Sequence, residues 1–133
     1  MTATAATLRW SEKSPPEDVS DPEALITRLH DIAAQCELDM PLIVSIYLHA
    51  HEVSLGLGLR ESFVQIEPDL GEPPYVLTVG DSTAHREVAF YLHGAHHTES
   101  PRRNLISAPE ALNVVREFLE TGERSERIAW EEV

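Results

Sequence analysis

Apolar residues between Pro22 and Cys36 recur at spacings of three and four, which is the period of a helix with one buried face. The helix begins at a recognisable signal, because Ser20 offers an N-cap hydroxyl three residues before Glu23 and Pro22 falls in the first turn. Pro41 ends the helical region. The residues predicted to face the core are Leu25, Ile26, Leu29, Ile32, Ala33 and Cys36.

After Pro41 the hydrophobic pattern changes to that of strands. The first run is continuously apolar and β-branched, as in a central strand, and the next two alternate between apolar and small or polar residues. Turn residues at 68–74 separate these from two further strand-like runs. Five strands with short connections predict an antiparallel meander. The five runs are Leu42–Ala50, Val53–Leu59, Ser62–Glu67, Tyr75–Gly80 and Glu87–His93.

A second helix begins at Ser107, again with a proline early and a glutamate three residues on, and Gly122 suits its left-handed C-terminal cap. The other segments are short. We expect a strand at 7–10, a polar loop at 11–20, a polar loop at 96–103, a brief strand or turn at 104–106 and an edge strand at 128–130.

These elements predict one α+β domain over residues 1–133, with residues 1–20 partly irregular. Its core is an antiparallel meander of about five to seven strands packed with two α-helices. A chain of 133 residues is near the commonest size of a single domain, and 42% of it is hydrophobic, so it can form a core without metals or disulfides.

The charge is strongly negative, with 23 acidic residues against 10 basic ones and a net charge of −13. Such a surface repels nucleic acids and anionic membranes and favours basic protein partners. Cys36 has no second cysteine to pair with, so it is either a small core residue or a reactive thiol. The sequence shows no signal peptide and no apolar run long enough to span a membrane, so we expect a cytoplasmic protein.

Seven histidines suggest metal chemistry. His49 and His51 are two residues apart at the end of a predicted strand, and His93, His96 and His97 cluster near Glu99. Neutral imidazoles that converge with a carboxylate bind zinc, but no established zinc motif is present. The alternatives are solvated loop histidines, or a partner surface whose affinity changes as histidine titrates.

Catalytic motifs are absent from the sequence. No serine lies in the GxSxG elbow of a hydrolase. Asp81 and Glu87 form at most a candidate carboxylate pair. Gly56 and Gly58 resemble part of a phosphate-binding loop, but the third glycine and the following helix of such a loop are missing. Within an alternating strand, such glycines favour a twist, a bulge or a close approach of another segment. We therefore predict a protein that is not an enzyme and needs no cofactor or metal.

Acidic side chains at strand ends and loops remain as candidates for binding a partner, with solubility as the alternative role. Trp130 is a large apolar anchor that either packs the last strand onto the sheet or contacts the partner. The predicted partner-binding residues are Glu67, Asp69, Glu72, Asp81, Glu87, Glu99 and Trp130.

The order and spacing of several short motifs resemble a known family, the small actinobacterial immunity proteins encoded beside deaminase-fold polymorphic toxins. The resemblance covers roughly residues 42–131 and departs from the family pattern at the histidine-rich stretch 93–97 and at Ser100, where the family often has an aromatic residue. The motifs that carry it are Tyr75–Asp81, Val88–Gly94, Thr98–Pro101, Ala111–Gly122 and Ile128–Trp130.

The resemblance implies an intracellular antitoxin without enzymatic activity, which binds and inhibits a cognate deaminase toxin. An acidic surface would cover the basic substrate groove that such an enzyme needs. Two alternatives remain open at this point: a secretion chaperone or adaptor for an effector, and a small metal-dependent enzyme that uses the histidine cluster. The sequence leaves the oligomeric state open.

Overall fold

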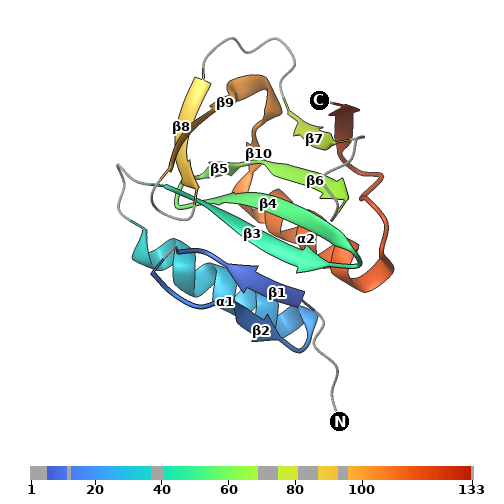
Figure 1. Ribbon diagram of the computed structural model, residues 1–133. Coiled ribbons are helices and arrows are strands. Elements are labelled where there is room, and N and C mark those ends of the chain that lie inside the picture. Colours follow the sequence, from blue (N-terminus) through green and yellow to red (C-terminus); the bar gives the residue numbers. More distant parts are fainter. Residues whose placement is uncertain are drawn as a thin grey trace.

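The computed structural model describes residues 6–11, 13–36, 41–68, 75–80, 87–92 and 96–132. It confirms the α+β class (Figure 1). Its helices are α1 (Pro22–Gln35), α2 (Ala108–Thr121) and the short 3₁₀ turn η1 (Arg102–Asn104). Its strands are β1 (Ala6–Arg9), β2 (Glu17–Val19), β3 (Leu42–Leu48), β4 (His51–Leu57), β5 (Glu61–Ser62), β6 (Val64–Pro68), β7 (Val76–Val79), β8 (Glu87–Leu92), β9 (His96–Pro101), β10 (Ile106–Ser107) and β11 (Ala129–Glu132).

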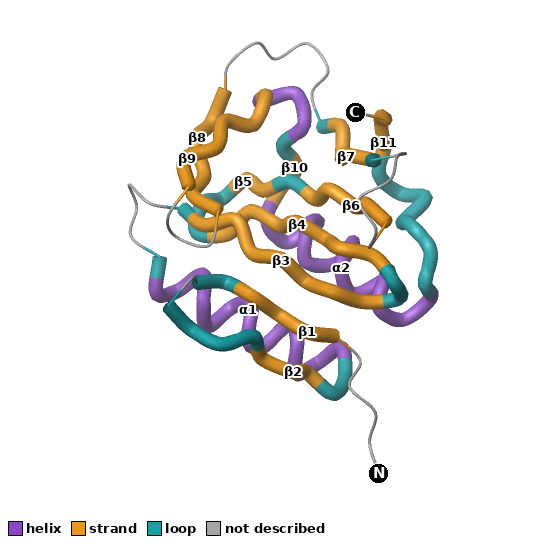
Figure 2. The backbone as a smooth tube through the Cα atoms, in the orientation of Figure 1, coloured by secondary structure: helices purple, strands orange, loops and turns teal. Residues whose placement is uncertain are grey.

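Within the described part of the chain, nine strands form one sheet. Its main path runs β11-β7-β6-β4-β3-β1-β2, and each neighbouring pair on this path is antiparallel. β3, β4, β6 and β7 form the predicted meander, and β11 lies at an edge as predicted. β5 and β10 form a separate two-stranded sheet (Figure 2).

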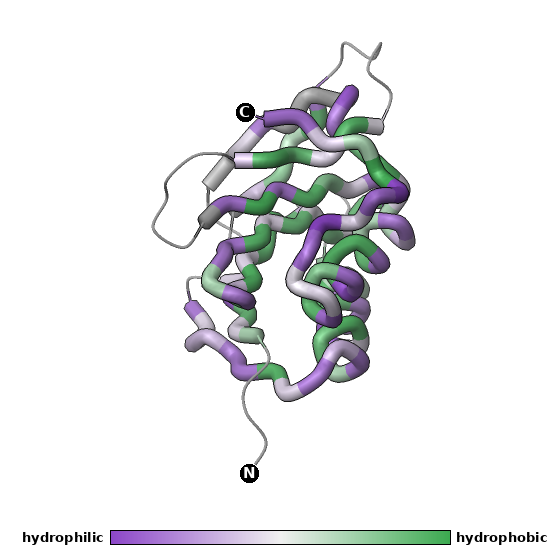
Figure 3. The backbone as a smooth tube through the Cα atoms, turned by 90° about the vertical axis from the view of Figure 1, so that its right-hand side faces the viewer, coloured by the Kyte–Doolittle hydropathy of each residue, from purple (hydrophilic) through white to green (hydrophobic). Residues whose placement is uncertain are grey.

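Both long helices cover the same face of the sheet, which we call the inner face; in Figure 1 they lie behind the strands. The main core forms between these two layers, which Figure 3 shows edge-on. Leu25, Leu29 and Ile32 of α1 are fully buried there, as the helical spacing predicts. Cys36 is half-buried against the same core, which fits the prediction of a small core residue. Among the described residues, no helix is long and apolar enough to cross a membrane.

The helix ends follow local sequence signals, with one correction. Ser107 caps α2 by accepting a hydrogen bond from the Glu110 amide, and Gly122 ends it with φ of 76°, both as predicted. For α1 the N-cap is Asp21 and not Ser20, because the Asp21 carboxylate accepts a 2.8 Å hydrogen bond from the Ala24 amide.

The β8–β9 hairpin packs against one end of the opposite, outer face of the sheet. β8 runs parallel to the start of β3, and the Tyr91 amide donates a 2.8 Å hydrogen bond to the Pro41 carbonyl. Phe90 is fully buried and forms an edge-to-face contact with Phe63. Together with neighbouring apolar residues they form a second, smaller core cluster, separate from the main one. The remainder of the outer face is left uncovered by the hairpin.

Four sequence predictions about strands are wrong. Residues 11–20 contain β2, and residues 96–103 contain β9 and the start of η1 where a loop was expected. The fifth predicted strand, β8, is not part of the meander, because it pairs with β9 and in parallel with β3. The third predicted strand is divided into β5 and β6 at Phe63.

Candidate functional site

The open part of the outer face carries a polar row that crosses five neighbouring strands. Residues directly opposite each other in paired strands point to the same face of a sheet. The register of the paired strands links five side chains across β2, β1, β3, β4 and β6, namely Asp18, Thr7, Tyr47, Glu52 and Glu67. A second row beside it contains Arg9, Ser45, Ser54 and Gln65. The polar surface defined by the two rows, in which Ser45 is buried and the other side chains are half-buried or exposed, is the candidate site.

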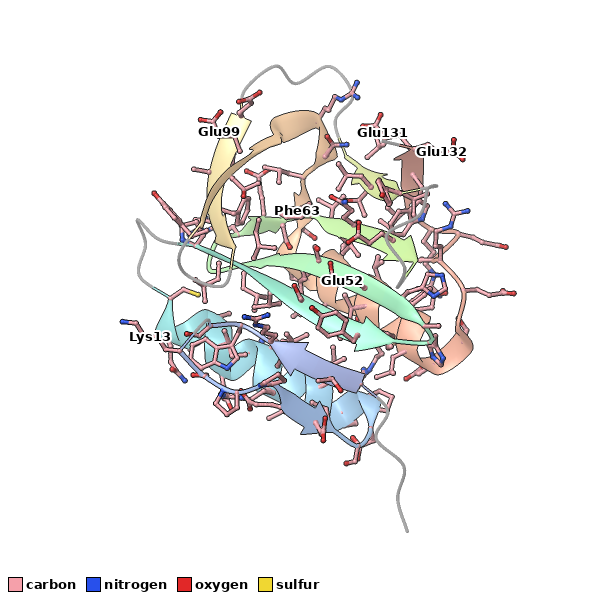
Figure 4. All side chains as sticks on the ribbon, in the orientation of Figure 1. Lys13, Glu52, Phe63, Glu99, Glu131 and Glu132 are labelled. Carbon is pink, nitrogen blue, oxygen red and sulfur yellow. The ribbon has the colours of Figure 1, made fainter. Side chains whose placement is uncertain are left out.

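Glu52 and Glu67 lie directly opposite each other on β4 and β6. Figure 4 shows Glu52 on the face of β4 that is turned away from the helices. Burial, reinforced by a hydrogen bond to Glu52 and by its charge, raises the pKa of Glu67 from 4.5 to about 7. Glu67 therefore retains its proton up to about neutral pH, since two adjacent carboxylates resist full ionisation.

Tyr47 extends this pair onto β3. Burial, together with the hydrogen bond and charge of Glu52, raises the pKa of the Tyr47 hydroxyl. The Tyr47 hydroxyl therefore stays protonated and donates a hydrogen bond to Glu52. We call Tyr47, Glu52 and Glu67 the acidic triplet.

Glu87 and Glu99 form a second acidic pair on the β8–β9 hairpin. Glu99 lies opposite Ala89, and Glu87 precedes Ala89 by two residues, so the carboxylates are diagonal neighbours on one face of the hairpin. A hydrogen bond to Glu99 and its charge raise the pKa of Glu87. Both side chains are exposed, and the alternation of side chains along β8 places them on the side of the hairpin opposite Phe90. Glu99 lies inside a strand and not in the predicted loop.

Trp130 is half-buried and packs the last strand against the main core. Its indole nitrogen donates a 2.9 Å hydrogen bond to the Ser125 carbonyl, and the Arg124 guanidinium lies 5.9 Å from the ring centre. The ring also lines an open cavity of about 850 Å³ beside the end of α2, whose walls include Phe118 and Ile66. These contacts show that Trp130 packs the last strand onto the core. Part of its ring remains accessible from the cavity.

The histidines whose side chains are described do not form a metal site. His49 contacts the Leu119 carbonyl at 2.8 Å, and both His49 and His51 stand edge-on to Phe118. Across the described ranges, no group of three or more His, Cys, Asp or Glu residues is placed to hold a metal ion. His93 and the side chains of His96 and His97 lie outside the described residues.

The structure thus brings together only part of the predicted set. Glu67 lies in the candidate site, Glu87 and Glu99 on the hairpin, and Trp130 on the inner side of β11, while Asp69, Glu72 and Asp81 lie outside the described residues. Sequence reasoning missed Tyr47 and Glu52. Strict alternation in His51–Leu57 places Glu52 on the polar face of its strand, but alternation alone does not reveal which residue lies opposite.

Gly56 has the structural role predicted for it. A Cβ at this position would lie 2.7 Å from Phe90 Cε1, so glycine permits the hairpin to approach β4 closely. Gly56 is therefore part of the packing of the outer face, at the border of the candidate site, whereas Gly58 lies against Cys36 and Pro41.

Comparison with known families gives the context for this surface. No curated protein sequence matches the chain. The model of the family described as Immunity protein Imm1 matches residues 10–132, which is nearly the whole chain. This assignment supports an immunity role, implies a toxin as the partner and argues against an enzymatic role. The chain belongs to the Imm1 immunity protein family.

Proposed function

We propose that this protein is a cytoplasmic antitoxin that binds a cognate deaminase-type toxin and blocks the toxin's basic substrate groove with an acidic surface. The observation that carries the proposal is the family match over residues 10–132, which implies a toxin partner. The deaminase class is an inference from the motif resemblance described above.

Electrostatics supports the mode of inhibition. A deaminase that acts on nucleic acid needs a basic groove and a pocket for the unpaired base. The net charge of −13 favours rapid capture of such a partner, and the open face carries Glu67 while the hairpin carries Glu87 and Glu99. Partly accessible Trp130 is an additional candidate anchor.

Co-expression with the protein encoded immediately upstream tests the proposal. We expect a stable 1:1 complex in a pull-down, loss of deamination activity in the complex, and rescue of growth in cells that express the toxin. A correctly folded toxin that neither binds this chain nor is inhibited by it would refute the proposal for that pair.

The same experiment separates inhibition from a chaperone role. An inhibitor that covers the groove prevents the purified toxin from binding single-stranded nucleic acid or nucleotide. A secretion chaperone has no need to do so, and a complex that retains full deaminase activity would favour it.

A further inference from the structure

We propose that the open cavity beside the end of α2 binds an exposed apolar side chain of the toxin, which packs against Trp130 and is flanked by lysine or arginine residues. This inference rests on the proposed function. It adds to that function the position of an anchoring contact and the chemistry of the toxin segment that makes it.

The cavity lies between the edge of the sheet and the segment that follows α2. The register places Ile66, Val76 and Glu132 in one row on the inner face of β6, β7 and β11. Phe118, near the end of α2, forms one wall, and the segment Gly122–Ile128, which runs beside the sheet towards β11, forms another (Figure 1). The volume of about 850 Å³ is in the range of ligand-binding cavities, so a large side chain can enter.

Trp130 and Ile128 provide accessible apolar surface in this cavity. Both side chains are half-buried and pack against the main core. The Ser125 carbonyl already accepts the hydrogen bond of the indole N–H, so the ring can be covered by an apolar group without leaving a polar atom unsatisfied. A large aromatic ring that is fixed in this way loses little conformational entropy when a partner covers it.

The charges around the cavity favour a basic partner. Three exposed carboxylates line it, and among the described residues none of them is in an ion pair; they belong to Glu123, Glu126 and Glu132. The guanidinium in the same lining, that of Arg124, lies 5.9 Å from the centre of the indole ring. His51 adds at most one further positive charge, so the rim remains net negative and complements lysine or arginine on the partner.

An apolar floor with an acidic rim matches the groove that a nucleic-acid deaminase needs. Proteins that bind single-stranded nucleic acid present aromatic side chains for base stacking within a positively charged groove. Such an aromatic residue is apolar at its centre and surrounded by cations, which is the complement of this cavity. A second copy of this chain is a poorer occupant, because two molecules of net charge −13 repel each other.

The test compares the two tryptophans of the chain, which have similar environments at different places. Trp10 is also half-buried against the main core, donates a 2.6 Å hydrogen bond to Glu17 and has the Arg28 guanidinium 5.7 Å from its ring centre, but it does not line the cavity. Trp130→Ala should weaken binding of the toxin encoded upstream, inactivated by a substitution of its own, about 30-fold or more. Trp10→Ala should change the affinity by less than about threefold.

A pair of double variants tests the acidic rim. Glu123→Gln/Glu126→Gln should weaken binding about tenfold, because the basic residues beside the anchor lose their partners. The control Asp18→Asn/Asp31→Asn removes the same charge from exposed positions on β2 and α1 and should change the affinity by less than about threefold. The difference between the two variants measures the local contact, since both reduce the long-range attraction equally.

Fluorine NMR provides a readout on the native fold. The chain labelled with fluorotryptophan gives two signals, one for each tryptophan, and Trp10→Phe assigns them. Addition of unlabelled toxin should shift the Trp130 signal and remove its solvent isotope shift, because the ring becomes covered. The Trp10 signal should stay unchanged.

Three outcomes would overturn this inference. If the toxin is inhibited while the Trp130 signal and the affinities of Trp130→Ala and Glu123→Gln/Glu126→Gln are unchanged, the interface lies elsewhere and the proposed function stands. If the native protein does not bind the toxin, the proposed function fails and this inference fails with it. A Trp130 signal that shifts with protein concentration in the absence of toxin would assign the cavity to a second copy of the chain.

Urea unfolding verifies that Trp130→Ala and Trp10→Ala are folded under the binding conditions. If Trp130→Ala does not fold, the fluorine signal of the native protein and the two double variants decide the question, because they leave the packing of Trp130 intact.

Discussion

At Gly56 the backbone of β4 lies so close to Phe90 that a side chain has no room. The ring of Phe90 is fully buried, and Phe63 borders the same space at 3.2 Å from the position of an added Cβ. The neighbouring aromatic rings therefore cannot move away into solvent. A single residue thus determines how closely the hairpin approaches the sheet.

Substituting Gly56→Ala should lower the free energy of unfolding by about 1–3 kcal/mol, because the added methyl group overpacks the second core cluster. Urea unfolding monitored by circular dichroism measures this change. Ser54→Ala, two residues earlier on the same face, should stay within about 0.5 kcal/mol of the native protein. Equal stability of Gly56→Ala and Ser54→Ala would show that the packing is looser than described.

Glu67 should make stability fall as pH rises. Its pKa in the folded protein is about 7 against an ordinary value of 4.5, so the folded state binds more protons than the unfolded state between these values. The contribution is fully present below about pH 4.5 and is lost as the pH rises through about 7. Glu67→Gln mimics the protonated form and should remove this part of the pH dependence.

At about pH 8 we expect Glu67→Gln to be more stable than the native protein by about 0.5–1 kcal/mol, since like charges directly opposite in a sheet are destabilising. Urea unfolding at about pH 5 and pH 8 measures the difference. Glu126→Gln, in an exposed turn, controls for the change in net charge. If the difference in stability between the native protein and Glu67→Gln were the same at both pH values, the raised pKa of Glu67 would be contradicted.

Among the elements, the β8–β9 hairpin depends on a few side chains for its position. Among the described residues, it pairs with the main path of the sheet only at Leu42 and Ile43 of β3, in parallel. Phe90, Val88 and their neighbours in the second core cluster supply the rest of its attachment. The hairpin is therefore a semi-independent element held mainly by apolar contacts.

Phe90→Ala should lower the free energy of unfolding by about 3–5 kcal/mol and should increase amide exchange in β8 and β9 more than in β4. Hydrogen exchange with mass spectrometry resolves these segments. Val88→Ala removes a half-buried side chain from the same strand and should have a smaller effect. Uniform exchange across the sheet in Phe90→Ala would mean that the hairpin unfolds only with the whole molecule.

Sequence patterns predicted elements well where the signal is local. Ser107 and Gly122 delimit α2 because caps depend on residues within one turn, whereas Asp21 and Ser20 are equivalent as sequence signals and only geometry separates them. β2 and β9 were missed because their residues are polar and do not alternate with apolar ones. β2 and β9 are strands because they pair with β1 and β8, and the sequence alone does not specify these pairings.

The candidate site was harder to predict because it depends on register across strands. Glu67 was singled out by its place near the end of a strand, but its partner Glu52 lies 15 residues earlier and meets it only through the β4–β6 pairing. Tyr47 joins the pair through a second register, that of β3 and β4. The alternation within one strand predicts which face of the sheet a side chain lies on. Its neighbours on the adjacent strands are known only once the sheet is assembled.

For the molecule as a whole, the net charge of −13 should control the rate at which the toxin is captured. We expect the association rate constant to fall about tenfold or more between about 50 mM and 500 mM NaCl, because salt screens long-range attraction. The dissociation rate constant should change much less, since close contacts determine it. Stopped-flow measurements over a salt series test this, and a salt-independent association rate would show that charge does not steer the encounter.

The division of the hydrophobic interior into two clusters has a consequence for how such proteins diversify. The main cluster joins both helices to the inner face, while the smaller one lies beneath the hairpin. Substitutions at well-separated sites usually have additive effects on stability. We therefore expect substitutions on the exposed side of the hairpin to be compatible with the two-layer scaffold, so this surface can diversify without loss of the fold.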